Sequence, residues 1–318
     1  MRRGRKRVEL HLHLEGAATP RDALFLASKY HSSGIDEKTV GELYAHHGLG
    51  DFLRHFGTVA SLLREPGDLV WLLGKLLRRL ASQRVAYAEI RVSPSVWERH
   101  GLEPEPGLKA LCAARFKGAV LYQFIVDGVR QWDRPLLERD LGLALQFRKQ
   151  GVAGFGLGGD EAAAPARLFA WLAAACREER MPLLVHAGEA LGPEEVAGAV
   201  DILGAKRIGH GIGAAGDPVL MRRLAGEAIH LEVCPSSNYA TGAVPMGTPH
   251  PVGLLVKHRV AVSLSTDDPG LFCTSLAREE RIARRAGLSE ADITRCNEAA
   301  ARAALLAPKE REALAGMV

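Results

Sequence analysis

The sequence predicts an α/β fold, a (β/α)8 barrel of the TIM type, from three observations. The chain has 318 residues, a length that suits one α/β barrel with insertions. Short apolar runs alternate with longer helical patterns, which is typical of βαβ units. Hydrophobic residues make up 47% and charged residues 25% of the sequence, enough for one large core. We therefore expect residues 1–318 to form a single domain, with a doubly wound open sheet as the alternative.

Eight short runs are candidate strands. Several of them are apolar almost without interruption, which is typical of parallel strands that are buried on both faces. The eight runs are Val8–Leu14, Tyr87–Val92, Ala119–Val126, Val152–Leu157, Leu183–His186, Arg207–His210, Ile229–Val233 and Val260–Ser265.

Helical patterns separate most of these runs, and further helices are expected after the eighth. A second-half helix is expected to begin near Gly192, because Pro193 and two acidic residues suit a first turn. Another helix is expected after Pro165, with four side chains on one face. These four are Leu168, Leu172, Ala175 and Cys176.

One connection, about residues 18–82, is too long for a simple loop. It carries helical patterns over Phe52–Leu63 and Leu69–Leu80. In a barrel this insertion leaves the carboxyl end of the first strand, which is the face where active sites lie. We therefore expect a helical insertion that serves as a lid or as a wall of the substrate pocket.

Composition argues against several classes of partner. The net charge is +4, much of it from a basic N-terminal run that we interpret as a solvated tail, so no nucleic acid is expected. No apolar stretch approaches the roughly 18 residues of a membrane span. Five cysteines without a CxxC pair argue against a disulfide framework and fit a reducing, cytoplasmic location. The basic residues are Arg2, Arg3, Arg5, Lys6 and Arg7.

Four clusters of titratable residues follow strand candidates one, five, six and eight. Each cluster alone has a structural explanation, such as a buried core histidine or an ordinary turn. Together they lie at carboxyl strand ends, which meet at one mouth of a barrel. Imidazoles with a carboxylate suit a zinc ion. The clusters are His11 with His13, His186 with Glu189, His210, and Asp267 with Asp268.

Two other patterns are set aside. Gly154, Gly156 and Gly159 match GxGxxG, but no full strand precedes the first glycine, as a dinucleotide site requires. We expect these glycines to make room for a flat ligand. The stretch after Cys234 lacks the PCxxC of cytidine-type zinc deaminases, so Cys234 is expected to be a small buried residue.

Five motifs of this chain closely resemble motifs of the adenosine deaminase family in the amidohydrolase superfamily. In chain order they are HLHLEG, HAGE, RIGHG, LEVCPSSN and STDDP. The likeness runs from about Val8 through the C-terminal helices. It implies one zinc ion per chain, or another divalent transition metal in its place. The implied metal ligands are His11, His13, His186 and Asp267.

The resemblance also implies roles around a purine ring. Glu189 passes a proton to N1, and His210 orients the attacking hydroxide. Asp268 contacts N7, and the backbone of Gly159 contacts N3. Glu15 stands where adenosine deaminases usually carry an aspartate that reaches the sugar hydroxyl.

The implied activity is hydrolytic deamination of adenosine or deoxyadenosine to inosine or deoxyinosine, with release of ammonia. The partner is thus a small purine nucleoside or a related adenine derivative; the sequence predicts no oligomeric state. GFGLGGDE, beginning at Gly154, departs from the usual Asp-Leu-Ala-Gly and is similar to 6-aminodeoxyfutalosine deaminases of menaquinone biosynthesis. Aminodeoxyfutalosine and free adenine are therefore alternative substrates.

Two alternatives outside deamination remain. A barrel metallohydrolase of the phosphotriesterase or dihydroorotase type often uses a carbamylated lysine, and no lysine ends strand candidates four or five. A non-enzymatic relative with a structural zinc needs neither a proton shuttle nor an open coordination position. The complete set of motif residues argues against it.

Overall fold

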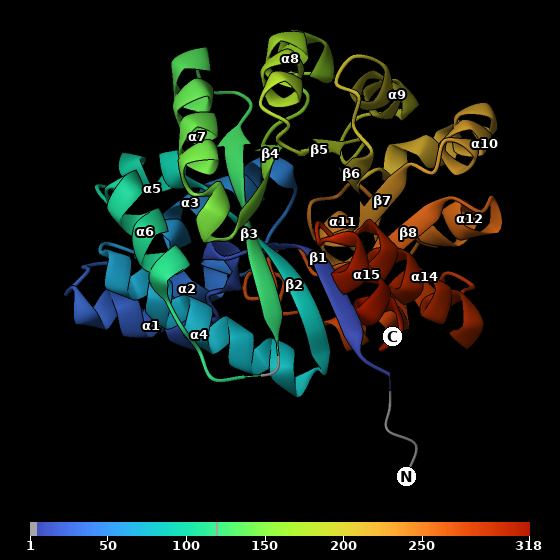
Figure 1. Ribbon diagram of the computed structural model, residues 1–318. Coiled ribbons are helices and arrows are strands. Elements are labelled where there is room, and N and C mark those ends of the chain that lie inside the picture. The colour runs from blue at the N-terminus through green and yellow to red at the C-terminus, as the bar shows by residue number, and fades with distance from the viewer. Residues whose placement is uncertain (1–4, 119) are drawn as a thin grey trace.

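The computed structural model describes residues 5–118 and 120–318, which form a barrel of eight parallel strands (Figure 1). The strands follow one another around the barrel in chain order. All eight predicted strands are confirmed, although Ala119, the expected start of the third, lies outside the described residues. The strands are β1 (Arg7–His13), β2 (Val85–Val92), β3 (Leu121–Val129), β4 (Val152–Gly158), β5 (Leu183–Ala187), β6 (Arg207–His210), β7 (His230–Val233) and β8 (Ala261–Leu264).

The barrel closes between its first and last strands through a short parallel bridge. The amide of His13 donates to the carbonyl of Asp267 (2.7 Å), and the amide of Asp267 donates to the carbonyl of His11 (2.9 Å). The open-sheet alternative is therefore wrong. The same two hydrogen bonds hold three predicted metal ligands side by side, so closing the fold also assembles part of the site.

The connection between β1 and β2 is helical, as predicted. Helix α3 packs on the turn Glu15–Ala17 that follows β1 and on α5 (Pro94–Arg99), so it lies over the carboxyl end of β1. A capping box of Thr19 and Asp22 begins the first of these helices. The four helices are α1 (Pro20–Lys29), α2 (Glu37–Leu43), α3 (Leu49–Ala60) and α4 (Pro66–Ser82).

The remaining helices surround the barrel, and the last three cover β1 and β8 near the two chain ends (Figure 1). Helix α9 (Pro193–Asp201) begins directly after Gly192, as predicted. The other helices are α6 (Pro104–Ala113), α7 (Arg134–Gln146), α8 (Ala170–Glu178), α10 (Pro218–Gly226), α11 (Pro235–Ala240), α12 (Val252–Lys257), α13 (Leu276–Arg285), α14 (Glu290–Ala303) and α15 (Pro308–Ala315).

Two sequence expectations need correction. The segment after Pro165 begins as a 3-10 turn, and the α-helix starts only at Ala170. Because a 3-10 turn has about 3.0 residues per turn, Leu168 leaves the buried face and is 53% exposed. Arg7 is not part of a solvated tail, because it begins β1 and its guanidinium pairs with Glu280 of α13 (2.6 Å).

The remaining expectations from composition concern the basic N-terminal run, the cysteines and membrane spans. Arg2 and Arg3 of the basic run lie outside the described residues. The five cysteines all lie within them and are free thiols, and Cys234 is fully buried, as expected. None of the helices in the described part combines the length and apolar character that a membrane crossing requires.

Two glycine-to-alanine variants test how tightly the helices pack around the barrel. A Cβ on Gly253 of α12 would lie 2.1 Å from the carbonyl oxygen of Ala286, whereas Gly142 of α7 is exposed with open space around it. We expect Gly253→Ala to lower the free energy of unfolding by about 1–3 kcal/mol. Gly142→Ala should raise it by about 0.5–1 kcal/mol. Urea unfolding measures both, and equal stability of the two variants would contradict the packing.

Candidate active site

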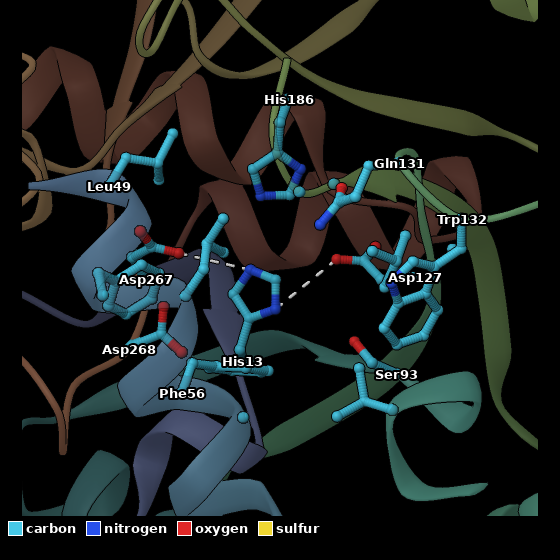
Figure 2. Close-up of a pocket in the computed structure, with 18 of the residues that line it drawn as sticks. His13, Leu49, Phe56, Ser93, Asp127, Gln131, Trp132, His186, Asp267 and Asp268 are labelled. Carbon is cyan, nitrogen blue, oxygen red and sulfur yellow. Dashed lines mark ion pairs between the residues drawn. The ribbon is translucent and has the colours of Figure 1, made fainter. Parts of the chain in front are cut away.

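A cavity of about 290 Å³ opens at the carboxyl ends of the strands (Figure 2). Helix α3 supplies one apolar wall through Leu49, Phe52, Leu53 and Phe56. The insertion is therefore a wall of the cavity; its movement as a lid stays a prediction. Seven titratable residues of the cavity come from strand ends and the loops after them: His13, Asp127, His186, Glu189, His210, Asp267 and Asp268.

Four imidazoles and one carboxylate converge at the base of this cavity. The ring centroid of His11 lies 4.6 Å from that of His186 and 5.2 Å from that of His210. One oxygen of Asp267 lies 3.4 Å from Nε2 of His11 and 3.4 Å from Nε2 of His13. Ligand atoms of His11, His186, His210 and Asp267 all lie within 4.8 Å of one another. His13, the remaining predicted ligand, adjoins this group through His186 and Asp267. Figure 2 shows His13 between Asp267 and Asp127, with His186 above it.

Hydrogen bonds at the far side of the rings leave Nε2 atoms free. The Nδ1 atom of His11 lies 2.8 Å from a carboxylate oxygen of Glu232, and Nδ1 of His186 lies 3.1 Å from the carbonyl of Leu157. Both acceptors require a hydrogen on Nδ1, which leaves a lone pair on Nε2. Nε2 of His11 is buried and has no hydrogen-bond partner among the described residues.

The electrostatics of the cluster suit a cation. Burial lowers the pKa of His13 and that of His186 well below the usual value, so both rings are neutral and able to coordinate. Burial alone would raise the pKa of Asp267, but His11 and the other imidazoles outweigh it and lower the pKa. Burial and the charge of Arg91 would lower the pKa of His11, but the carboxylates of Asp267 and Glu232 outweigh them and raise it. Two neutral imidazoles beside an ionised carboxylate fit one metal ion.

Two site residues have a backbone conformation that is uncommon for residues other than glycine. His210 ends β6 with φ of 60°, and Asp267 follows β8 with φ of 60°. This left-handed region is sparsely populated by side-chain-bearing residues and costs of order 1 kcal/mol or more. The surrounding barrel therefore holds both side chains at the cavity although the backbone at these two residues is strained.

Glycines of β4 and β6 leave space for these side chains. A Cβ on Gly209 would lie 2.6 Å from a ring carbon of His11, and a Cβ on Gly156 would lie 1.5 Å from Oδ1 of Asp127. The expectation that the β4 glycines admit a flat ligand is therefore wrong for Gly156, which makes room for Asp127. Gly158, by contrast, borders the cavity beside His186.

Glu189 lies beside the cluster on the loop after β5. One of its carboxylate oxygens is 3.5 Å from Nε2 of His210. Burial, together with the charges of Asp267 and Glu161, raises the pKa of Glu189 to about 8. Glu161 also holds this loop in place, because its carboxylate accepts from the amides of Gly188 (2.8 Å), Ala190 and Leu191. A protonated Glu189 at neutral pH suits a proton donor.

Asp268 lines the cavity next to Asp267. Burial and the neighbouring charge of Asp267 raise its pKa well above the usual value. Its Oδ1 is buried and has no hydrogen-bond partner among the described residues. Gly16 leaves room for this carboxyl group, since a Cβ there would lie 1.7 Å from Oδ1. Asp268 is therefore poised to exchange a hydrogen bond with a molecule in the cavity.

The two remaining predicted residues differ in position. Gly159 borders the cavity with φ of 98°, and a Cβ there would meet Gln131. Glu15 is fully buried and is not among the cavity-lining residues. Its carboxylate accepts from the amide of Ser93 (2.8 Å) and from the indole of Trp97 (2.6 Å). Ser93 itself lines the cavity.

A layer of buried charges below the cluster was missed by the sequence analysis. Arg91 pairs with Asp127 (2.9 Å) and Glu232 (3.0 Å), and Arg207 pairs with Glu232 (2.5 Å) and Glu89 (2.7 Å). The available signal is a charged residue within an otherwise apolar strand run. In a barrel such a side chain on the inner face must find a partner there.

Comparison with known proteins places these residues in a family context. The adenosine deaminase family model matches residues 6–318. An adenine deaminase of a Chelativorans species is 36% identical over 97% of this chain and 96% of that protein. An aminodeoxyfutalosine deaminase of Streptomyces avermitilis is 34% identical over 89% of this chain and 81% of that protein. The crystal structure of an adenine deaminase from Arthrobacter aurescens superposes with a TM-score of 0.91 at 25% identity, covering 99% of this chain and 98% of that one.

The metal site predicts a specific loss on mutation. We expect His186→Ala to leave purified protein with little bound metal, because it removes one of the converging imidazoles. His47→Ala is the matched control, since His47 is exposed and outside the cavity. Metal per chain is measured by plasma mass spectrometry. Equal metal content in both variants would contradict a site that uses His186.

Proposed function

This chain belongs to the adenosine deaminase family, and from its site we propose that it hydrolyses the 6-amino group of an adenine ring to a 6-oxo group with release of ammonia. The observation that carries the proposal is the pairing of a partly buried carboxyl group with a raised pKa, that of Glu189, with a cluster that fits one metal ion. Neither a structural metal site nor a simple binding pocket requires that pairing.

We propose one zinc ion per chain, held by three imidazoles and one carboxylate. A zinc ion in such a site lowers the pKa of water to about 7. The donor types support this choice, because nitrogen ligands with one oxygen ligand are typical of zinc. The ligands in this proposal are His11, His186 and Asp267, which belong to one compact group, and His13, whose Nε2 lies 3.4 Å from Asp267.

The chain's own residues then act on the ring. Addition of a water oxygen to C6 places negative charge on N1, and Glu189 supplies the proton that neutralises it. His210 directs a hydrogen-bond donor at the attacking oxygen. Asp268 contacts N7, and the backbone of Gly159 contacts N3. Of the two water hydrogens, one restores the carboxyl group of Glu189. The other passes from the C6 oxygen to the amino group as the C6–N bond breaks, so that ammonia leaves and a carbonyl remains at C6.

Glu15 is assigned a less direct role on the substrate. One oxygen of its carboxylate, Oε1, accepts from both Ser93 and Trp97, while Oε2 is buried and has no hydrogen-bond partner among the described residues. We propose that Glu15 acts through Ser93, which borders the cavity. Adenosine deaminases usually carry a shorter aspartate at this position, and the longer side chain reaches the strand-end loop instead of the cavity.

The relatives favour adenine or aminodeoxyfutalosine over adenosine as the substrate. Both names occur among proteins that match nearly the whole chain. The cavity of about 290 Å³ lies near the lower end of the roughly 300–1,000 Å³ typical of pockets for drug-sized ligands. That volume accommodates more than a bare purine base.

A cation at the cavity rim favours a substrate with an acidic end. The guanidinium of Arg99 lies 4.0 Å from the ring centroid of Trp132, and both side chains border the cavity. The nearby acid Glu98 pairs with Arg139 instead (2.6 Å). Aminodeoxyfutalosine ends in a benzoate, which matches an aromatic surface beside a guanidinium. We therefore propose an extended, acidic adenine nucleoside as the better substrate.

The role of Glu189 is tested by Glu189→Gln, which keeps the shape and removes the transferable proton. We expect kcat to fall by about 10²–10⁴-fold while metal content is unchanged. Ammonia release and loss of the adenine absorbance band measure turnover. Near-normal turnover in this variant would remove Glu189 from the proposed chemistry.

Substrate preference is tested with adenine, adenosine, deoxyadenosine and aminodeoxyfutalosine side by side. We expect the highest kcat/KM for aminodeoxyfutalosine, and a loss of about tenfold or more in Arg99→Gln for this substrate alone. Arg134→Gln is the control, because Arg134 stacks on Trp171 (4.3 Å) and does not border the cavity. Equal losses on neutral and acidic substrates would refute a carboxylate contact by Arg99.

A further inference from the structure

A line of hydrogen bonds runs from the backbone to His210 on the side away from the cavity. The amide of Val252 donates to Nδ1 of His250 (3.1 Å). Nε2 of His250 lies 3.2 Å from Oδ1 of Asn238, and Nδ2 of Asn238 lies 3.1 Å from Nδ1 of His210. The three side chains are at most 3% exposed. Water therefore does not compete for these contacts.

The backbone amide at one end fixes the direction of every bond in the line. Because an amide can only donate, Nδ1 of His250 must accept, and the hydrogen of the neutral ring lies on Nε2. That hydrogen requires an oxygen from Asn238, which turns the amide nitrogen of Asn238 toward His210. Nδ1 of His210 must then accept, and its hydrogen lies on Nε2.

This reasoning requires that the ring of His250 is neutral, and its burial in the protein makes it so. Burial lowers the pKa of His250 to about 4. The carboxyl groups of Glu189 and Asp267 face Nε2 of His210 and not its Nδ1. The amide of Asn238 is therefore the group that determines the state of Nδ1.

We propose that Asn238 and His250 are positioning residues that hold His210 in the tautomer with hydrogen on Nε2. This tautomer is opposite to that of His11 and His186, whose Nδ1 atoms face acceptors. His210 thus presents a donor where the other rings present lone pairs. Four imidazoles can meet at one point while His210 stays out of the metal's ligand set.

The donor of His210 points into the reaction space. Its Nε2 lies 3.5 Å from Glu189 and 3.9 Å from Asp267. A hydrogen there can be directed at the attacking oxygen, as the proposed function requires. The inference rests on that function only for its kinetic consequence, since the tautomer itself is a property of the resting protein.

The tautomer is measured directly in the zinc-loaded protein. Histidine labelled with ¹⁵N gives long-range ¹H–¹⁵N spectra in which protonated and unprotonated ring nitrogens are distinct. His210→Gln identifies the signals of His210 by their loss. We expect a protonated Nε2 and an unprotonated Nδ1. A protonated Nδ1 on His210 would overturn the proposal, whatever the substrate of the enzyme proves to be.

Asn238→Asp tests the consequence, because a carboxylate of the same size accepts from both rings and reverses the tautomer of His210. We expect kcat to fall by about 100-fold or more with KM within about threefold, and the ¹⁵N pattern of His210 to invert. Ser237→Ala is the control on the same helix, since Ser237 is equally buried and outside the line. It should stay within about twofold of the parent.

The two readouts separate the possible failures. Inversion of the ¹⁵N pattern with unchanged kcat would overturn the catalytic importance of the line. Unchanged ¹⁵N shifts in folded Asn238→Asp would overturn the positioning role of Asn238. Failure of the parent protein to release ammonia from any adenine compound would refute the proposed function, while the tautomer measurement on that protein would still decide the positioning role.

Discussion

The site depends on charges that are buried inside the barrel and neutralise one another. Arg91 and Arg207 lie between three acids on the inner faces of β2, β3 and β7. Loss of one partner from a buried pair typically costs about 3–5 kcal/mol, because the remaining charge has neither water nor a counterion. This layer also supports the imidazoles above it, since Glu232 faces both Arg91 and His11. The proposed chemistry therefore depends on a layer of buried ion pairs in which single substitutions are strongly destabilising.

Burial acts differently on neighbouring acids because their partners differ. Asp267 is surrounded by imidazoles, which lower its pKa although burial would raise it. Asp268 has Asp267 and Glu15 as charged neighbours, and its pKa is raised. Glu189 is buried near Asp267 and behaves like Asp268. Adjacent carboxyl groups can thus serve as an anionic ligand, a hydrogen-bond donor and a proton source in one small volume.

The sequence predicted the barrel and the convergence of the motif residues because both follow from local patterns. Strand runs bury both faces, and parallel strands put their carboxyl ends at one mouth. The contacts of Glu15, Glu232 and His250 could not be predicted in this way, since they depend on side-chain directions between distant segments. The prediction that Leu168 is buried was wrong for a local reason, because a 3-10 turn changed the direction of its side chain relative to the following α-helix. The donor and acceptor in each hydrogen bond from His250 to His210 can be assigned only when the backbone amide that donates to His250 is known.

The residues at the base of the cavity and those at its rim have different structural constraints, which explains how relatives with one chemistry can differ in substrate. The histidine–aspartate cluster and Glu189 come from carboxyl strand ends and the loops after them, and the charge layer comes from residues within the strands. Each of these side chains is fixed by several others. The apolar wall comes from α3 of the insertion, and the rim cation comes from the last residue of α5. Loops and exposed helix ends tolerate substitution far better than buried ion pairs. A change of substrate therefore requires new residues at the rim, while Glu189, the acid that we propose to serve N1, stays where the barrel holds it.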